Sequence, residues 1–395
     1  MTGIEVVITG AARTAIGTFQ GSLKDRPPTD LGAIVVKAAL ERGGVEPKAV
    51  GHVVFGNVIH TEPKDMYLAR VAALDGGIEP HTPCLTVNRL CGSGLQAVVS
   101  AAQSIMLGDA DVAVAGGAES MSRAPHSTQT LRTGQRMGDA TFADMMMGAL
   151  SDPFGNGQMG MTGENVAKRW QVTREDQDSF ALASQTRAAR AIAEGRFREQ
   201  IVPVMVRKGR EEISFDVDEH VKGGTTKETL AGLRPAFLKD GTVTAGNSSG
   251  INDGAAALVL MSAERAEREG LKPLARIIGY AHAGVDPGVM GIGPIHAVRI
   301  LMERTGLDVS DFDVIESNEA FAAQACAVSR ELGLPAEKTN PNGGAIALGH
   351  PIGATGAVLT VKTIYELRRT NGRIGLITMC IGGGQGIAVA IERLN

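Results

Sequence analysis

The sequence predicts an α/β protein made of two similar halves, with a loop-rich segment inserted between them. Over the first 120 residues, short apolar runs alternate with amphipathic segments, which is typical of a largely parallel sheet covered by helices. From about 121 to 248 the chain becomes polar and loop-rich, and the alternation then returns. The 395 residues are also too many for one ordinary core, so more than one lobe is expected.

The first half alternates strands and helices in chain order. Apolar runs of strand length predict strands at 4–9, 52–55, 85–88 and 111–115. Helices are predicted at 30–43, capped by Asp30 and ended by glycines, and around 66–74. Apolar residues at helical spacing from Leu95 to Met106 place Cys91 at or just before a third helix.

The inserted segment contains one long predicted helix, capped by Thr173 and Asp176 and ending near Gly195. Its three methionines at 145–147 could face a substrate or a second subunit. Beyond it we expect strands and helices in alternation, with strands at 255–261, 274–280, 313–317 and 374–379 and helices at 295–304, 320–332 and 351–369.

The two halves also resemble each other. The glycine-rich turn and helix at Cys91 have a counterpart at His350, and the strand ending in Gly116-Gly117 has one ending in Gly382 to Gly384. We therefore predict a structural duplication with the active site where the halves meet. The predicted units are 1–121 with 249–272 for the first half, 122–248 for a loop domain, and 273–395 for the second half.

Cys91 is the first candidate for chemistry. The unpaired N–H groups and positive dipole of a helix start favour a thiolate, the nucleophilic form of cysteine. A single cysteine is more often a small buried core residue. Possible partners in the last third of the chain favour the catalytic interpretation here.

Three motifs in that last third supply such partners. Pro351 fits the first position of a helix, which would leave His350 exposed at a turn, able to accept a thiol proton or simply to cap the surface. Cys380 precedes three glycines whose N–H groups could form an oxyanion hole, or it is a buried cysteine before a glycine turn. Asn318 lies between a strand and a helix, where an ordinary N-cap is the alternative.

Together these residues favour acyl transfer through a thioester, because a nucleophilic cysteine is joined by a histidine and a second thiol. There is no Walker lysine motif, and no GxGxxG follows the first strand, so phosphate transfer from nucleotides and hydride transfer lack support.

Four motifs resemble the signatures of the thiolase family, and within it the acetyl-CoA acetyltransferases and bacterial β-ketothiolases. They are Asn88–Gly94, Asn318–Phe321, Gly349–Ala354 and Cys380–Gly384. The likeness covers essentially the whole chain. It implies a duplicated thiolase fold, layered α/β/α/β/α, with a loop domain and a dimeric or tetrameric assembly. It also implies an acyltransferase that condenses two acyl-CoA (acetyl-CoA) molecules to β-ketoacyl-CoA, or catalyses the reverse thiolysis. No cofactor is implied, because coenzyme A is substrate and product.

The resemblance implies a role for each motif residue. Cys91 would carry the acyl group, His350 would activate it, and Cys380 would be the acid and base at the α-carbon. Asn318, through a water, and His350 would hold one oxyanion, and the N–H groups of Cys91 and Gly382 the other. The implied coenzyme A pocket is drawn from the segments 233–237 and 245–250 and from single residues elsewhere, and its members include Gln158, Met159, Ala236, Phe237, Ala245, Ser249, Met290, Ala320 and Phe321.

Gln158 departs from the short-chain biosynthetic members of the family, which carry histidine there. Glutamine can form hydrogen bonds but does not titrate, so the preferred acyl chain length stays open. The alternatives are a broad-range thiolase of fatty-acid breakdown, a decarboxylating ketoacyl synthase, which Cys380 disfavours, and a non-catalytic acyl-CoA carrier, which the intact catalytic set disfavours.

Composition narrows the partners and the compartment. The net charge is −4 without any block of lysine or arginine, which argues against nucleic-acid and anionic-membrane partners. Four cysteines lack metal-ligand spacing and are too few for a disulfide scaffold, so we expect no metal site and a reduced compartment. No signal peptide is apparent at the N-terminus, and no apolar run is long enough to span a membrane. A cytoplasmic protein is therefore predicted.

Overall fold

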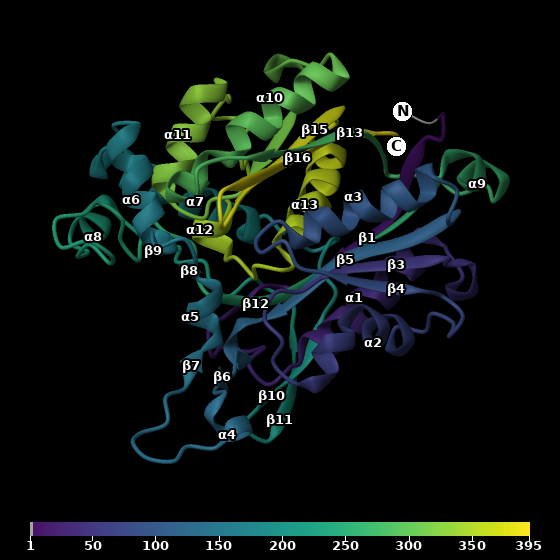
Figure 1. Cartoon of the computed structure of the whole chain (residues 1–395). Helices are drawn as coiled ribbons and strands as arrows, with labels where there is room; N and C mark the ends of the chain where they lie inside the picture. Colours follow the sequence, from purple (N-terminus) through teal and green to yellow (C-terminus); the bar gives the residue numbers. More distant parts are fainter. Residues whose placement is uncertain (1–2) are drawn as a thin grey trace.

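The computed structural model describes residues 3–395 (Figure 1), so the first two residues of the segment inspected for a signal peptide lie outside the described part. Within this range the main sheet has ten strands, nine of them in the order β14-β15-β16-β13-β1-β12-β5-β3-β4, with β2 paired to β12. Their bounds are β1 Val6–Arg13, β2 Gly17–Thr18, β3 His52–Gly56, β4 Cys84–Val87, β5 Val112–Ser120, β12 Asn252–Ser262, β13 Ala275–Gly284, β14 Val314–Ser317, β15 Ile374–Ile381 and β16 Gln385–Arg393.

The main sheet consists of two half-sheets of the same topology. The first half-sheet contains β1, β3, β4, β5 and β12, with the short β2 off its path. Numbered one to five along the chain, these strands lie in the order third, second, fourth, fifth, first from the sheet edge to the junction. The second half repeats this order. Its third strand is represented only by an isolated parallel bridge between Ile315 of β14 and Thr339. The halves join where β1 meets β13 in antiparallel pairing, at Val7 and Ile8. The predicted duplication is confirmed.

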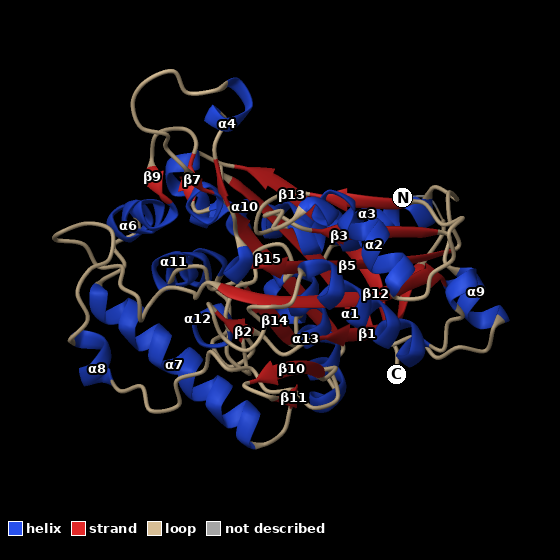
Figure 2. Cartoon of the chain, turned by 90° about the horizontal axis from the view of Figure 1, so that it is seen from below, coloured by secondary structure: helices blue, strands red, loops and turns tan. Residues whose placement is uncertain are grey.

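Helices form three layers around the two half-sheets in the described part of the chain (Figures 1 and 2). α1 (Pro28–Gly43) contacts the first half-sheet together with α2 (Leu68–Asp75). α10 (Gly293–Thr305) contacts the second half-sheet, with α11 (Ala322–Leu332) beside it. α3 (Ser93–Met106) and α13 (Thr355–Thr370) pack on each other between the halves. The predicted α/β/α/β/α layering is therefore confirmed, and its central layer brings together the chain segments after Cys91 and His350.

The segment between β5 and β12 carries short elements and one long helix. α7 starts at the predicted cap, where Thr173 and Asp176 form a capping box, and it packs on α11. The elements are β6 His126–Ser127, α4 Thr130–Thr133, β7 Ala143–Asp144, α5 Met145–Ala149, β8 Ser151–Asp152, β9 Gly157–Gln158, α6 Met159–Arg169, α7 Arg174–Ala193, β10 Val204–Lys208, β11 Glu211–Phe215 and α8 Lys227–Ala231. The exact domain boundaries stay a prediction.

Two short helices, α9 (Ala263–Arg268) and α12 (Ala345–Leu348), complete the α-helices of residues 3–395. Single 3₁₀ turns are found at Pro47–Ala49, Pro63–Tyr67, Met121–Arg123, Pro287–Ile292 and Val309–Asp311. None of the described helices is long and apolar enough to cross a bilayer.

Two sequence-based expectations about the last 45 residues were wrong. The helix predicted from Pro351 begins at Thr355, because the intervening residues form a turn in which the N–H groups of Ala354 and Thr355 donate to the Pro351 carbonyl. The strand β16 was not predicted. It pairs with both β15 and β13, so it lies inside the sheet next to the junction of the halves.

Candidate active site

Cys91 lies in a tight turn between β4 and α3. The helix begins at Ser93, so the prediction of a cysteine just before a helix start is correct. The Ser93 hydroxyl accepts from the Arg89 N–H at 2.8 Å and donates to the Leu90 carbonyl at 2.6 Å. Leu90 has a φ of 44°, in the left-handed region that leucine rarely adopts. The turn is thus held in a strained conformation, which is common at functional sites.

The Cys91 sulfur faces the glycine turn after β15. The backbone N–H groups of Gly382 and of Cys91 itself both act to lower the pKa of the Cys91 thiol. Burial nevertheless raises the pKa of Cys91 to about 11, so desolvation outweighs the helix N-terminus that we expected to favour a thiolate. Cys380 is fully buried beside it, and burial together with the nearby Cys91 sulfur raises its pKa as well. Both sulfurs are therefore thiols at rest.

Gly382 can approach Cys91 because it has no side chain. A Cβ built on Gly382 would lie 2.8 Å from Cε of Met159 and 3.0 Å from Cδ1 of Leu90, closer than carbon atoms normally pack. The glycine turn of the second half therefore presents a backbone N–H group to the nucleophile of the first half.

His350 differs from its prediction. It is buried, with 5% of its surface exposed, because it precedes a packed turn instead of capping a helix at the surface. Its Nδ1 lies 2.7 Å from Oγ1 of Thr355, and that hydroxyl donates to the Pro351 carbonyl at 2.9 Å. The single hydroxyl proton is thus used, so Nδ1 carries a proton and donates it, and Nε2 is left as an acceptor. Burial lowers the pKa of His350 to about 4, so the imidazole is neutral near pH 7.

Asn318 faces the free nitrogen of this imidazole. Its Nδ2 lies 3.5 Å from His350 Nε2. The amide oxygen is buried and has no hydrogen-bond partner in the described part of the chain. α11 begins at Ala322 with Phe321 as its N-cap, so Asn318 is not the ordinary cap that was the alternative. An amide oxygen of this kind can accept a hydrogen bond from a water or a substrate.

A cavity of about 600 Å³ opens beside His350. Of the residues predicted for a coenzyme A pocket, nine line it: Gln158, Met159, Ala236, Phe237, Ala245, Ser248, Ser249, Gly250 and Phe321. Met290 and Ala320 do not line it and are buried in the apolar cluster that also contains Met159, Phe321 and Cys380. Cys91 packs against the apolar cluster of Ile59, Met121 and Ile352, and two members of this cluster, Met121 and Ile352, line the cavity, so the nucleophile adjoins the cavity.

Several lining residues were not identified from the sequence: Thr18, Phe19, Met121, Leu150, Gly160, His220, Lys222, Thr244, Ile251 and Ile352. The polar ones matter most, and His220 and Lys222 follow Asp218, which forms a fully buried ion pair with Arg13 at 2.8 Å. No local pattern marks these residues. Long-range pairing with β1 brings them to the cavity.

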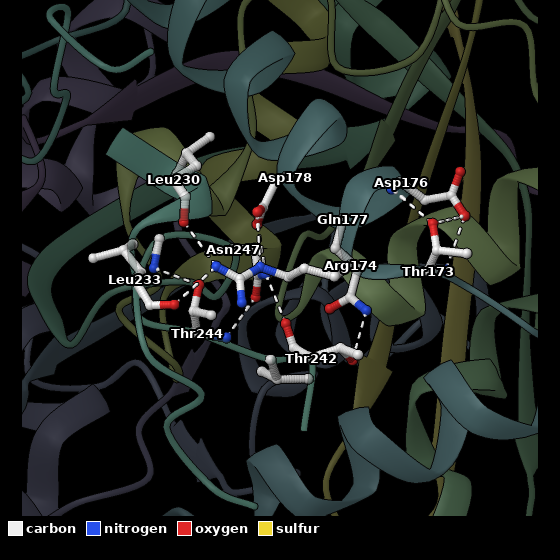
Figure 3. A network of polar contacts seen from close by, with 12 residues as sticks. Thr173, Arg174, Asp176, Gln177, Asp178, Leu230, Leu233, Thr242, Thr244 and Asn247 are labelled. Carbon is white, nitrogen blue, oxygen red and sulfur yellow. Dashed lines mark hydrogen bonds and ion pairs between the residues drawn. The ribbon is translucent and has the colours of Figure 1, made fainter. Parts of the chain in front are cut away.

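One wall of the cavity is held by α7 (Figure 3). Arg174 donates to Asp178 at 2.7 Å and to carbonyls of the segment 230–233. Asn247 donates to the other Asp178 oxygen at 2.9 Å. The Asn247 amide oxygen accepts from the Thr244 N–H at 2.7 Å. Thr244 begins the segment 244–249, which supplies Ala245 and Ser249 to the wall. The contacts of Asn247 are buried, so they fix this part of the wall, and the half-buried Arg174 ties the wall to the segment 230–233.

Two family models together match nearly all of the chain. The model described as the thiolase N-terminal domain matches residues 6–264, and that of the thiolase C-terminal domain matches residues 271–393.

Similar proteins carry related names. The chain is 61% identical over 391 residues to the beta-ketothiolase BktB of Cupriavidus necator, with 99% of each chain covered. It is 52% identical to an acetyl-CoA acetyltransferase of Chromobacterium violaceum, covering 99% of this chain and 100% of that protein.

Solved structures agree with this likeness. The acetyl-CoA acetyltransferase of Bacillus anthracis superposes with a TM-score of 0.97 at 48% identity, and 99% of each chain is covered. The human mitochondrial 3-ketoacyl-CoA thiolase in complex with CoA superposes with a TM-score of 0.96 at 44% identity, covering 99% of this chain and 98% of that chain. With its duplicated fold and both domain models matched, the chain belongs to the thiolase family.

Proposed function

We propose that this thiolase transfers acyl groups through a thioester on Cys91, condensing two acetyl-CoA molecules or cleaving acetoacetyl-CoA with CoA. The observation that carries the proposal is the tautomer of His350. Its Nδ1 proton is bound to Thr355, so Nε2 is an acceptor in a neutral imidazole. A thiol with a pKa of about 11 needs such a base to become a nucleophile near neutral pH.

In the acylation step the Cys91 sulfur attacks the thioester carbonyl of the first acyl-CoA as its proton passes to His350 Nε2. The C–S bond to coenzyme A breaks, and the leaving thiolate takes a proton from Cys380. The N–H groups of Cys91 and Gly382, which both favour the charged form of the Cys91 sulfur, are suited to hold the oxyanion.

In the condensation step the Cys380 thiolate removes an α-proton from the second acyl-CoA. The resulting carbanion attacks the acetyl carbonyl on Cys91, a carbon–carbon bond forms, and the Cys91 sulfur leaves and recovers its proton from His350. Burial raises the pKa of Cys380, which makes its thiolate a stronger base toward a weakly acidic C–H group. Asn318 Nδ2 and His350 Nε2 are 3.5 Å apart, which supports a role for these two residues in holding the enolate oxygen of the second substrate.

The cavity suits an acyl-CoA substrate. Its walls are largely apolar, as expected for the pantetheine arm and acyl chain, and Lys222 and His220 offer polar contacts. Gln158 is exposed at the cavity and replaces the histidine typical of short-chain members, so it is the residue with which chain length is best tested.

CoA-dependent cleavage of acetoacetyl-CoA, β-ketovaleryl-CoA and a longer β-ketoacyl-CoA tests this function, with Gln158→His as the matched variant. We expect acetoacetyl-CoA to be cleaved by the wild type and not by Cys91→Ala. Longer substrates that match or exceed it would identify a broad-range thiolase instead. Cleavage of none of them would overturn the proposal.

We also propose that the chain forms a homodimer or homotetramer in the cytoplasm. β4 ends the path of the main sheet, and its Leu85 is 46% exposed. The segment around α4 extends away from the molecule (Figures 1 and 2) and carries Leu131, Met137 and Phe142, which are all exposed. Unpaired edge strands and exposed apolar groups favour self-association. The four free cysteines suit a reduced compartment. Light scattering on a size-exclusion column would give the oligomeric state.

A further inference from the structure

The turn that carries His350 is held by side chains from the other half of the molecule. The His350 N–H donates to Oδ1 of Asn252 at 2.9 Å, and the Gly353 N–H donates to Oε2 of Glu119 at 2.8 Å. Both side chains are fully buried. Asn252 starts β12 and Glu119 is near the end of β5, which are antiparallel neighbours. Two adjacent strands of the first half thus bind both ends of a turn from the second half.

Asn252 has a second contact that fixes its amide. Its Nδ2 donates to the Gly17 carbonyl at 2.9 Å, which leaves Oδ1 pointing to the His350 N–H. Gly349, with a φ of 108°, brings the chain so close that a Cβ there would lie 2.6 Å from Asn252 Oδ1. The amide is therefore in direct contact with the start of the turn.

Glu119 joins the same turn to the surroundings of Cys91. Its two oxygens also accept from the N–H groups of Val58 and Ile59 and from the Asn57 amide, all at 3.1 Å. Val58 and Cys91 both pack on one apolar cluster, which includes Ile59 and Ile352. No cation pairs with Glu119 among residues 3–395, so backbone and amide donors alone stabilise its charge.

The backbones of the two catalytic turns also touch. The Gly353 carbonyl would be 2.6 Å from a Cβ on Gly56 and 3.1 Å from one on Gly94, the second residue of α3. Side chains are missing on both sides of this contact. The distance between the turns is therefore set by the polar groups that hold them, and not by adjustable side-chain packing.

We propose that Glu119 and Asn252 are positioning residues that fix His350 relative to Cys91. This rests on the roles proposed above for Cys91 and His350. Neither residue lines the cavity, so each acts through the turn that it holds. A displacement of about 1 Å at a reacting group can lower a rate about 100-fold.

The test compares Glu119→Gln and Asn252→Ala with the wild type and with Glu366→Gln. Glutamine has the shape of Glu119, but its NH₂ group must face two of the four donors, because each carboxylate oxygen accepts from two of them. Asn252→Ala removes the acceptor of the His350 N–H. Glu366 is a matched control, because it is also a buried carboxylate that accepts from an asparagine amide, that of Asn342. It lies on α13, 11 residues after Thr355, which is about 16 Å along the helix. Burial raises the pKa of Glu119 to about 8, so assays at pH 8.5 keep most of it ionised.

The measurement is kcat per acylatable site for acetoacetyl-CoA thiolysis, with KM for CoA. Acylatable sites are counted by mass spectrometry as Cys91 acetylated by acetyl-CoA. We expect kcat per site to fall at least tenfold in both variants, with KM for CoA within twofold and no change in Glu366→Gln. A purely structural role would lower the number of sites and the Tm but leave kcat per site unchanged, and that result would overturn the proposal.

With two positioning variants and Cys91→Ala, the test distinguishes misfolding, failure of the proposed function and failure of this inference. If Glu119→Gln does not fold, Asn252→Ala tests the proposal by itself. A decrease in its kcat per site supports the positioning role, and an unchanged kcat per site contradicts it. If Cys91→Ala keeps thiolysis, the proposed function fails first. If Cys91→Ala is inactive and both positioning variants keep full kcat per site, only this inference fails.

Discussion

Replacing Thr355 by valine removes the hydroxyl that orients the imidazole of His350 while keeping the shape of the side chain. The hydroxyl lies 2.7 Å from Nδ1 and donates to the Pro351 carbonyl, and both residues are buried. Valine leaves the Nδ1 proton without a partner. The imidazole then loses its preference for the tautomer in which Nε2 can accept the thiol proton.

The magnitude follows from the burial of this hydrogen bond. Leaving a buried donor unpaired costs about 1–3 kcal/mol. If that cost falls on the transition state, kcat decreases about 5- to 150-fold, since about 1.4 kcal/mol corresponds to tenfold. Thr355 does not line the cavity, so KM for CoA should stay within about twofold.

Steady-state thiolysis of acetoacetyl-CoA measures both constants, and Thr355→Ser is the control because it keeps the hydroxyl. We expect the serine variant to retain at least half of the wild-type kcat. A valine variant with wild-type kcat would refute the assignment of the tautomer. An equal loss in both variants would assign the effect to packing.

Four further changes test other parts of the site. Alkylation of Cys91 by iodoacetamide should accelerate about tenfold per pH unit from pH 7 to 9, because its pKa is about 11, and a plateau in that range would reveal a resting thiolate. Between pH 6.5 and 4 the unfolded chain protonates His350 before the folded chain does. The free energy of unfolding of the wild type should therefore fall by up to about 3 kcal/mol more than that of His350→Gln, measured by denaturant titration. Gly382→Ala should lower kcat, because its Cβ would lie 2.8 Å from Cε of Met159 and 3.0 Å from Cδ1 of Leu90 and would shift the turn that carries the Gly382 N–H group, whereas an unchanged kcat would show that these side chains accommodate the methyl group without moving that N–H group. Asn247→Ala should raise KM for CoA several-fold with little change in kcat, because Asn247 holds the cavity wall. A lower kcat with an unchanged KM would show that Asn247 does not act through the CoA-binding wall.

The sequence predicts the parts of the site that depend on neighbours along the chain. Cys91 precedes α3 because the apolar spacing after Leu95 is helical, and that spacing is visible locally. The duplication was recognisable because glycine turns recur at matching places. These turns must be glycine wherever the backbones of the two halves touch, as at Gly94.

The features that escaped prediction depend on distant contacts. Pro351 fits a helix start and a turn equally well by local rules, and only the bonds to Asn252 and Glu119 select the buried turn. Lys222 reaches the cavity because Asp218 pairs with Arg13, and these two residues are 205 positions apart in sequence. Pairing between such distant residues leaves no periodic signal along the chain.

Trapping the acyl-enzyme tests the central claim most directly. The protein would be mixed with acetyl-CoA, quenched in acid within milliseconds, digested and mapped by mass spectrometry. One acetyl group per chain on the peptide that contains Cys91, formed at least as fast as turnover, is the predicted result. An acetyl group on another residue, or turnover that persists in Cys91→Ala, would contradict transfer through a Cys91 thioester.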